Sequence, residues 1–513
     1  MNILGLGGIH NEAACALLRN GQIAAAAEEK KIARRATANG VPDHAIQSCL
    51  TASGVKPAEI DCVAVVRPFA ENIPLALRTR FPNARIVVVE HHMAHAASAY
   101  YPSPFDEATV LTLDRGGDVR CGARWLGHGT ELAVDKELYV PDSLGGLYGR
   151  VTELLGFEPN ADEHKVQWLS TSGDDRYVGV FDEMLGGDWP SFDRSWFNAE
   201  RSSGFSSKFF RALDLDPDAP VPAGLHAHIA AGVQRAVEKA VGRMAGDAKR
   251  LCLAGGLAMN ALLVSSLEQG REVFVQPAAG NAGTALGAVF SAWHGVYRET
   301  ARVALGDLCF GPQFRAEEIK QVLENCKLHF RYFITMDEII DLAVAQLSDN
   351  QIVAWMHGRM EFGPRALGNR SILASPLNPY STENLNVFIK HRESFRKFAA
   401  SVPEEQAGEY FDVGPNARYL ATVGRVKAAH RKTFQSAILG DDLVRVHTVR
   451  REDNPLYYKL LQAAGRATGL PVLYNTSFNL FGDPLVCSPR DAARSFFSSG
   501  IDSMFVGNFF LSK

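Results

Sequence analysis

The chain lacks the features that mark membrane, secreted and nucleic-acid-coating proteins. It has no apolar run of about 18 residues, the length that a membrane-spanning helix needs. No basic segment precedes the apolar residues 3–6, so we expect no signal peptide. Its eight cysteines include no Cys-x-x-Cys pair, which favours free thiols in a reducing compartment over zinc binding. The net charge of −4 provides no broad basic field, so we expect a cytoplasmic protein without a membrane or nucleic-acid partner.

What is present is typical of a large globular protein. The 513 residues are 46% hydrophobic and 21% charged, enough for more than one domain with a full core. The pattern restarts after a break near 305–335, which predicts one domain over 1–325 and a second over 326–513. Residues 126–225 are irregular and read as an insertion in the first domain. Its aromatic residues either line an acceptor cleft or form the core of the insertion; they are Trp189, Phe192, Trp196, Phe197 and Phe205.

The first domain contains a repeated unit of strand, Gly- or Asp-rich turn, and strand. The unit occurs at 3–18 and again at 109–125. Such a repeat predicts a duplicated α/β core that grips phosphates between its halves. A buried strand at 251–254 then leads through Gly255 and Gly256 to a helix that opens near Asn260. This step suits a nucleotide on the helix N-terminus, and equally suits plain tight packing between strand and helix.

Histidines in the first domain suggest a metal site and a base. His91 and His95 lie four residues apart, so on a helix they share one face, and Asp114 ends the following strand. Two imidazoles and a carboxylate suit a divalent transition metal, iron included. The alternative is a pair of buried histidines satisfied by hydrogen bonds, with His92 pointing elsewhere. His10, in the first Gly-rich turn, is either structural or a base for an attacking hydroxyl.

The second domain carries clustered positive charge. Residues 358–371 read Gly-Arg-Met-Glu-Phe-Gly-Pro-Arg-Ala-Leu-Gly-Asn-Arg-Ser, a strand-fed loop rich in glycine and arginine. Arginine forks match phosphate and carboxylate oxygens two at a time. The predicted anion pocket comprises Arg365, Lys390, Arg396 and Arg445, with hydrogen bonds from Asn475 and Ser477 in a loop at 475–479. The alternative is a set of surface charges that never meet in space.

In this order the motifs resemble one family over nearly the whole chain. They are the loop 358–371, the basic cluster 390–396, the strand 445–449, the segment 475–479 with Gly482-Asp483-Pro484, His91-x-x-x-His95 followed by Asp114, and the turn 255–260. The chain resembles the O-carbamoyltransferases of the nodulation and antibiotic-biosynthesis group, including the tobramycin and cephamycin types. The resemblance implies an α/β protein, with a duplicated actin/hexokinase-type ATPase domain followed by a YrdC-like α/β domain.

The resemblance also implies a two-step reaction. Carbamoyl phosphate and ATP give carbamoyl adenylate in the second domain, and the first domain transfers the carbamoyl group to a hydroxyl of a small natural product. It implies carbamoyl phosphate and ATP contacts at Arg365, Lys390, Arg396, Arg445, Asn475 and Ser477, nucleotide contacts at Gly255, Gly256 and Asn260, and a general base at His10. The implied cofactors are Mg²⁺ with ATP and a divalent metal, iron being favoured, on His91, His95 and Asp114.

The sequence departs from the family pattern at three places. Asn281 stands where a further metal-binding aspartate is usual, and it is a candidate fourth ligand through its amide oxygen. Asn11 follows His10 in place of aspartate, and Ala36-Thr37 replace a basic residue or histidine. Two rival functions are a sugar kinase or ATPase on the same fold, which would not need the second basic domain, and a non-catalytic nucleotide-binding relative.

Overall fold

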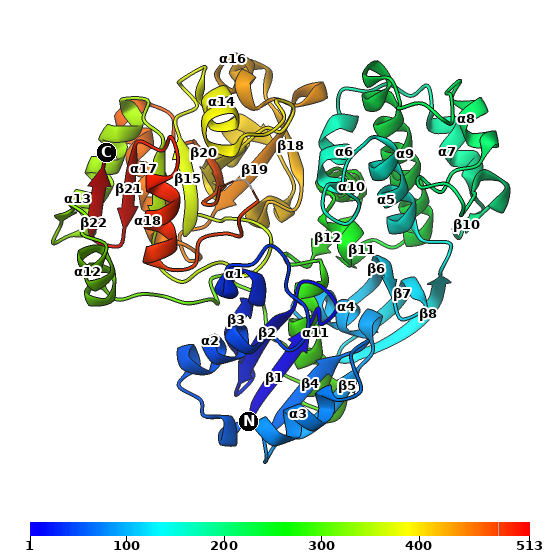
Figure 1. The fold of residues 1–513 in the computed structure, drawn as a ribbon, viewed down its shortest axis with the longest axis horizontal. Helices are drawn as coiled ribbons and strands as arrows, with labels where there is room; N and C mark the ends of the chain where they lie inside the picture. The colour runs from blue at the N-terminus through cyan, green and yellow to red at the C-terminus, as the bar shows by residue number, and fades with distance from the viewer. Residues whose placement is uncertain (481) are drawn as a thin grey trace.

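The N-terminal part is built on two central β-sheets that have the same strand topology (Figure 1). The computed structural model describes residues 1–480 and 482–513. The first sheet has the order β3-β2-β1-β4-β5, from strands β1 (Asn2–Gly7), β2 (Ala14–Arg19), β3 (Gln22–Glu28), β4 (Cys62–Val66) and β5 (Arg85–Val89). The second has the order β8-β7-β6-β11-β12, from β6 (Glu107–Gly117), β7 (Arg120–His128), β8 (Glu131–Tyr139), β11 (Arg250–Ala254) and β12 (Glu272–Val275).

The two sheets pair their strands in the same way. β1 and β6 each pair antiparallel with the next strand along the chain and parallel with a later strand. The duplicated α/β core predicted from the repeated unit is therefore confirmed. Strand β8 was not predicted, because its residues are mostly exposed and no buried apolar run marks it.

Helices fill the space between the two sheets and cover their outer faces. α4 (His91–Tyr100) packs against β6 and β11, while α11 (Thr284–Phe290) packs against β1 and against α4. A side chain on Gly287 would place its Cβ 1.7 Å from the carbonyl oxygen of Ala94, so glycine permits this close helix contact. The outer face of the first sheet carries α1 (Glu29–Ala33), α2 (Asp43–Ser53) and α3 (Ile73–Arg80).

The insertion after β8 is a helical subdomain whose apolar core is continuous with one face of the second sheet. It comprises α5 (Leu144–Leu154), α6 (Glu163–Ser170), α7 (Val178–Met184), a small hairpin of β9 (Leu185–Gly186) and β10 (Ser191–Phe192), α8 (Ser207–Ala212) and α9 (Ala223–Ala245). Phe192, Trp196 and Phe205 are buried in its core, and Trp189 and Phe197 pack against it. The aromatic residues therefore build the insertion, and α10 (Ala261–Glu268) packs beside α9.

The C-terminal part is a mixed sheet flanked by helices. Its strands lie in the order β13-β22-β21-β14-β15-β20-β16-β19-β18-β17. The strands are β13 (Arg331–Tyr332), β14 (Val353–Met356), β15 (Arg370–Ala374), β16 (Ala399–Pro403), β17 (Phe411–Asp412), β18 (Val423–Val426), β19 (Leu443–Val449), β20 (Leu473–Ser477), β21 (Ser503–Val506) and β22 (Phe509–Ser512). The helices are α12 (Ala316–Asn325), α13 (Met336–Ser348), α14 (Ser381–Asn384), α15 (Ala407–Tyr410), α16 (Arg431–Phe434), α17 (Pro455–Thr468) and α18 (Pro489–Phe497).

Two details of the C-terminal part differ from the sequence expectations. Residues 475–477, the first part of the loop expected at 475–479, lie in β20, which pairs with both β15 and β16. Helix α12 lies before the predicted boundary at 325/326, yet Ile319 and Leu323 are buried in the C-terminal core and α12 packs on α18. We propose to place the boundary before residue 316. Among the described residues, we find no helix with the length and apolarity of a membrane span.

Candidate active site

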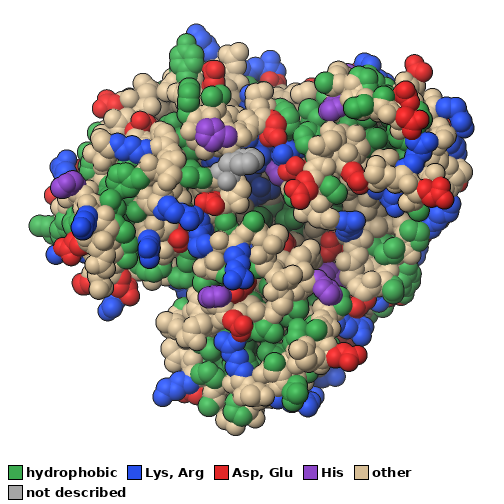
Figure 2. Space-filling view, viewed as in Figure 1, with side chains coloured by type: hydrophobic (Ala, Val, Ile, Leu, Met, Phe, Trp, Pro, Cys, Tyr) green, Lys and Arg blue, Asp and Glu red, His purple; other side chains and the backbone are tan. Residues whose placement is uncertain are grey.

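A cavity of about 1080 Å³ is lined by residues from the first domain, its insertion and the C-terminal loop 358–371. Predicted site residues on its wall are His10, His91, Asp114, Gly256, Asn260, Asn281 and Arg365. Its lining does not include Gly255, His95, Lys390, Arg396, Arg445, Asn475 or Ser477. In the space-filling view a hollow opens between the C-terminal part and the insertion, with Lys or Arg side chains visible inside it (Figure 2).

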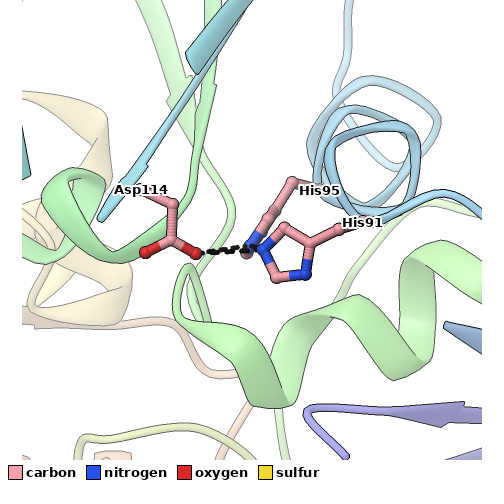
Figure 3. A group of neighbouring side chains, drawn as sticks. All are labelled: His91, His95 and Asp114. Atoms are coloured by element: carbon pink, nitrogen blue, oxygen red, sulfur yellow. Dashed lines mark hydrogen bonds and ion pairs between the residues drawn. The ribbon is translucent and has the colours of Figure 1, made fainter. Parts of the chain in front are cut away.

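Helix α4 presents two histidines to the end of strand β6. The Glu90 carboxylate accepts hydrogen bonds from the backbone N–H groups of His92 (2.9 Å) and Met93 (2.7 Å), which caps α4 and places His91 in its first turn. Asp114 Oδ2 lies 3.1 Å from His91 Nε2 and 3.2 Å from His95 Nε2 (Figure 3). The two Nε2 atoms are 3.1 Å apart. The predicted i, i+4 pair and its carboxylate thus converge on one point.

The donor set at this point fits a divalent transition metal. His91, His95 and Asp114 are all buried, and each offers one ligand atom. Burial lowers the pKa of His95, which favours the neutral imidazole that binds metals. Burial alone would raise the pKa of Asp114, but its hydrogen bonds to His91 and His95 outweigh that effect and lower it. A carboxylate facing two imidazole nitrogens is the ligand chemistry of zinc or non-haem iron sites.

The neighbours of the three side chains fix their positions. A Cβ on Gly117 would lie 2.1 Å from the His91 ring, so only glycine leaves room for that ring. His92 points away, as predicted: its ring nitrogens lie 3.0 Å from Thr112 Oγ1 and 3.0 Å from the Arg120 carbonyl oxygen. Its role is to hold α4 against the second sheet.

Two of the departures from the family pattern face each other. Asn281 Nδ2 donates a hydrogen bond to Asn11 Oδ1 at 2.6 Å, across the junction of the first turn and the loop before α11. This bond occupies the amide nitrogen of Asn281. Its buried Oδ1 has no hydrogen-bond partner among the described residues. An unpartnered amide oxygen beside the histidines fits the role of a fourth, weaker metal ligand.

His10 is exposed to the cavity from the turn between β1 and β2. Gly8 in this turn has φ +61°, and its N–H donates to Thr284 Oγ1 at 3.1 Å, which ties the turn to the start of α11. Lys30, Arg67 and Arg115 also line the cavity, although no sequence motif singles them out. Lys30 pairs with Glu12 at 3.1 Å. The third departure, Ala36-Thr37, lies on the same wall.

The turn at 255–260 shows why the sequence left two interpretations open. Gly255 has φ +96°, and a Cβ there would lie 2.2 Å from the Leu113 carbonyl oxygen, so this glycine serves strand packing. Asn260 Oδ1 accepts from the first N–H groups of α10, and its Nδ2 donates to Gln234 Oε1 at 2.7 Å. Gly256 lines the cavity with its backbone. A ligand contact from Asn260 would therefore have to displace bonds that cap α10.

The Gly-rich loop 358–371 is folded around a buried carboxylate. Glu361 Oε1 accepts hydrogen bonds from the backbone N–H groups of Leu367 (2.8 Å), Asn369 (2.8 Å) and Arg370 (3.1 Å). The Arg370 side chain is fully buried and donates to backbone carbonyl oxygens, including that of His357 at 2.7 Å. Arg359 likewise donates to backbone carbonyls. Of the arginines in this loop, Arg365 is therefore the one that is directed to the cavity.

Arg365 belongs to an arginine cluster with Arg392, Arg396 and Arg445. Burial and then repulsion from Arg396 lower the pKa of Arg365 to about 10. The same causes lower the pKa of Arg392 to about 9, and burial with repulsion from Arg365, Arg392 and Arg396 lowers that of Arg445. Within the described residues no carboxylate pairs with Arg365 or Arg445, while Glu393 lies 3.6 Å from Arg396. The predicted charges do meet, and a bound anion would relieve their repulsion.

The remaining predicted contacts brace this cluster. Lys390 is buried, and its Nζ donates to the carbonyl oxygens of Ser477 (2.6 Å) and Asn479 (2.8 Å) and to Asn479 Oδ1 (2.7 Å). A phosphate contact would require it to give up one of these bonds. Ser477 Oγ donates to Asn479 Oδ1 at 2.9 Å. Asn475 Nδ2 donates to the Ala366 carbonyl oxygen at 3.2 Å, and its Oδ1 is buried without a partner in the described chain.

Helix α6, in the insertion of the first domain, contacts residues of the arginine cluster and its surroundings. Lys165 forms an ion pair with Glu393 at 2.9 Å, and the Trp168 ring lies 5.2 Å from the Arg445 guanidinium carbon. His164 lines the cavity together with Arg365. Sequence patterns could not identify these residues, because nothing in α6 itself signals that it packs against strand β19.

Lys31 makes a second contact between the domains, at the loop that carries Arg365. Lys31 on α1 is buried and ion-paired with Glu28, and its Nζ also donates to the carbonyl oxygens of Glu361 (3.1 Å) and Gly363. The first domain thus holds the loop that carries Arg365.

Both the N-terminal and the C-terminal part of the chain match one protein family. The family description "Carbamoyltransferase N-terminus" matches residues 63–290, and "Carbamoyltransferase C-terminus" matches 344–513. The Synechocystis protein sll1178 is 33% identical, with 100% of this chain and 97% of that protein covered. The nodulation protein NolNO of Sinorhizobium fredii is 31% identical over 98% of this chain and 79% of its own.

Two further matches cover smaller parts. The 3'-hydroxymethylcephem-O-carbamoyltransferase of Amycolatopsis lactamdurans is 36% identical over 32% of this chain and 31% of its own. Among solved structures, component A of the Acidaminococcus fermentans (R)-2-hydroxyglutaryl-CoA dehydratase matches with a TM-score of 0.38 and 16% identity, covering 58% of this chain and 99% of that chain.

Proposed function

The chain belongs to the carbamoyltransferase family and is a transferase enzyme, and we propose that it is an ATP-dependent O-carbamoyltransferase that works through carbamoyl adenylate. The acceptor is a hydroxyl of a small natural product. This acceptor class is supported by the name of the cephem O-carbamoyltransferase, whose substrate carries a hydroxymethyl group.

The first half-reaction belongs to the arginine cluster. Carbamoyl phosphate loses its phosphate to water, and the resulting carbamate oxygen attacks the α-phosphorus of ATP, bound with Mg²⁺, so that pyrophosphate leaves. Carbamoyl phosphate, carbamate, ATP and pyrophosphate are all anions, and phosphoryl-type transfer depends mainly on positioning and charge stabilisation. Arg365, Arg396 and Arg445 provide that positive charge. Because they are partly buried, their electrostatic attraction to an anion is stronger than it would be in water.

The second half-reaction belongs to the first domain. His10 accepts the proton of the acceptor hydroxyl as its oxygen attacks the carbamoyl carbon, and AMP leaves. A divalent metal, iron being favoured, would be held by His91, His95, Asp114 and the Asn281 amide oxygen, and would supply Lewis acidity to the carbonyl. Gly256 offers a close backbone approach to the nucleotide portion.

One observation carries the proposal: Arg365 and His10 line the same cavity. A carbamoyl adenylate formed at the arginine cluster could reach the histidine without passing through bulk water. This matters because an acyl adenylate hydrolyses readily, and enclosure protects such an intermediate. A kinase or plain ATPase would not need the second cationic site.

The two half-reactions can be separated by two variants. Arg365→Ala should abolish pyrophosphate release driven by carbamoyl phosphate, because it removes charge from the anion cluster. His10→Ala should keep pyrophosphate release and lose carbamate ester formation. The exposed residues Arg490 and His128 provide matched controls, Arg490→Ala and His128→Ala, which should behave like wild type.

Either variant can refute its part of the proposal. Pyrophosphate release that is unchanged in Arg365→Ala would remove the arginine cluster from the first step. Ester formation at the wild-type rate in His10→Ala would leave His10 with a structural role.

A further inference from the structure

His164 on α6 holds an unpaired hydrogen-bond acceptor beside the arginine cluster. Its Nδ1 lies 3.0 Å from the Ala161 carbonyl oxygen. A carbonyl can only accept, so Nδ1 carries the proton, and the lone pair of the neutral ring lies on Nε2. Nε2 is buried and has no hydrogen-bond partner anywhere in the described chain. Such a group is usually satisfied in a native state, so it indicates a ligand.

The surroundings keep His164 in its neutral form. Burial, with added repulsion from Arg396 and Arg365, lowers the pKa of His164 to about 3. At neutral pH the ring therefore accepts a hydrogen bond and adds no charge. It lines the cavity together with Arg365, so its position is next to the proposed anion site.

A second unpaired acceptor, on Asn475, lies near the backbone next to Arg365. Asn475 Nδ2 donates a hydrogen bond to the carbonyl oxygen of Ala366, the residue after Arg365. The buried Oδ1 of Asn475 has no partner among residues 1–480 and 482–513. The other groups of the cluster are donors, and the nearby Glu393 is already paired with Lys165. The site thus combines strong donors for phosphate oxygens with separate acceptors.

This arrangement matches the chemistry of a carbamoyl group. Carbamoyl phosphate and acetyl phosphate carry the same phosphate, and they differ in an NH₂ group in place of a CH₃ group. Arginines hold either phosphate, but only the NH₂ group can donate to a lone acceptor. A site built around such an acceptor rejects the analogue that leaves it unpaired.

We propose that His164 is a specificity-determining residue for the acyl group, its Nε2 accepting a hydrogen bond from the carbamoyl NH₂. The inference rests on the proposed function, because it assumes that the arginine cluster binds carbamoyl phosphate. It means that the insertion of the first domain takes part in substrate selection in the second.

The test compares kcat/KM for pyrophosphate release with carbamoyl phosphate and with acetyl phosphate. Wild type should prefer carbamoyl phosphate by at least about tenfold, since an unpaired buried acceptor in the acetyl complex is unfavourable. In His164→Leu that preference should fall about tenfold, through weaker use of carbamoyl phosphate. His164→Gln places an amide oxygen near the position of Nε2 and should keep the preference within about threefold of wild type.

The ratio of the two substrates separates selection from packing. A purely structural role would lower kcat/KM for both substrates alike and leave the ratio unchanged. If wild type uses carbamoyl phosphate and His164→Leu keeps the wild-type ratio, the role of His164 is refuted and the proposed function stands. If wild type releases no pyrophosphate with carbamoyl phosphate, the proposed function itself fails, and this inference fails with it.

Discussion

A single methyl group on Gly117 should disable the proposed metal site without replacing any of its candidate ligands. Gly117 ends β6 next to α4, and a Cβ there would lie 2.1 Å from His91 Cδ2 and 2.4 Å from its Cγ. Contacts this short do not occur in real structures, so in Gly117→Ala the ring must withdraw by more than an ångström. His91 Nε2 would then leave the point where it meets His95 and Asp114.

The size of the effect follows from the number of ligands. The site has few protein ligands, and the candidate fourth, the Asn281 amide oxygen, is weak. Disturbing groups that only orient a metal ligand typically weakens binding about 10- to 100-fold, or about 1.4 to 2.8 kcal/mol. Displacing His91 itself should reach at least the upper end of this range.

Metal binding is measured directly, by titrating the apo protein with Fe²⁺ or Co²⁺ and by elemental analysis after dialysis. Gly116→Ala is the matched control, because a Cβ on the neighbouring glycine would lie 3.8 Å from a Val140 methyl group, an ordinary contact. We expect Gly116→Ala to bind like wild type. Gly117→Ala should lose the metal and ester formation and keep pyrophosphate release, since the arginine cluster is untouched.

Equal metal affinity in Gly117→Ala and Gly116→Ala would contradict this reasoning. It would mean that His91 does not contribute to a metal site, and that the three buried side chains are satisfied by their mutual hydrogen bonds.

Three further predictions concern the arginine cluster and the second domain. Trp168→Ala removes the ring that lies 5.2 Å from the Arg445 guanidinium carbon and should raise KM for carbamoyl phosphate about 3- to 30-fold. Trp168→Phe is the control, because it keeps most of this contact. An unchanged KM in Trp168→Ala would refute the role of the ring. Burial lowers the pKa of His447 to about 3, below its unfolded value of about 6.5, so the unfolded chain binds more protons between these pH values. The free energy of unfolding in urea should fall as the pH falls from about 6.5 towards 3, and less steeply in His447→Gln; equal slopes contradict this. Lys390→Met should lower the free energy of unfolding by about 2 to 4 kcal/mol, because it removes the brace on 477–479, whereas Arg365→Ala should change it by less than about 0.5 kcal/mol. Equal stability of the two variants would show that Lys390 is not a brace.

Elements with strong local signals were predictable from the sequence. Helices α2 and α13 carry such signals, because each combines an apolar period with one or two acidic residues in its first turn. The repeated strand–turn–strand unit gave the duplicated core, and the i, i+4 spacing of His91 and His95 gave the convergence on Asp114. In each case the decisive contacts are made by nearby residues or by a regular period.

Other features depend on contacts that no local pattern encodes. The composition around Asn475 is typical of a turn, yet tertiary pairing places it in a strand between β15 and β16. Arg359 and Arg370 look like ligand contacts in the sequence, but the fold uses them to hold backbone carbonyls. The approach of Trp168 to Arg445 follows from the packing of the insertion on the second domain.

Residues of the first domain support the arginine cluster of the second. Lys31 of the first domain holds the loop of Arg365, and Lys165 of the insertion pairs with Glu393 beside Arg396. Adenylate formation should therefore require the full chain.

The most direct test of the account is pyrophosphate release from ATP by the purified protein, without an acceptor, in the presence and absence of carbamoyl phosphate. We expect release that depends on carbamoyl phosphate, because the proposed first half-reaction needs no acceptor hydroxyl. Release at the same rate without carbamoyl phosphate, or no release from a protein that still binds ATP, would contradict it.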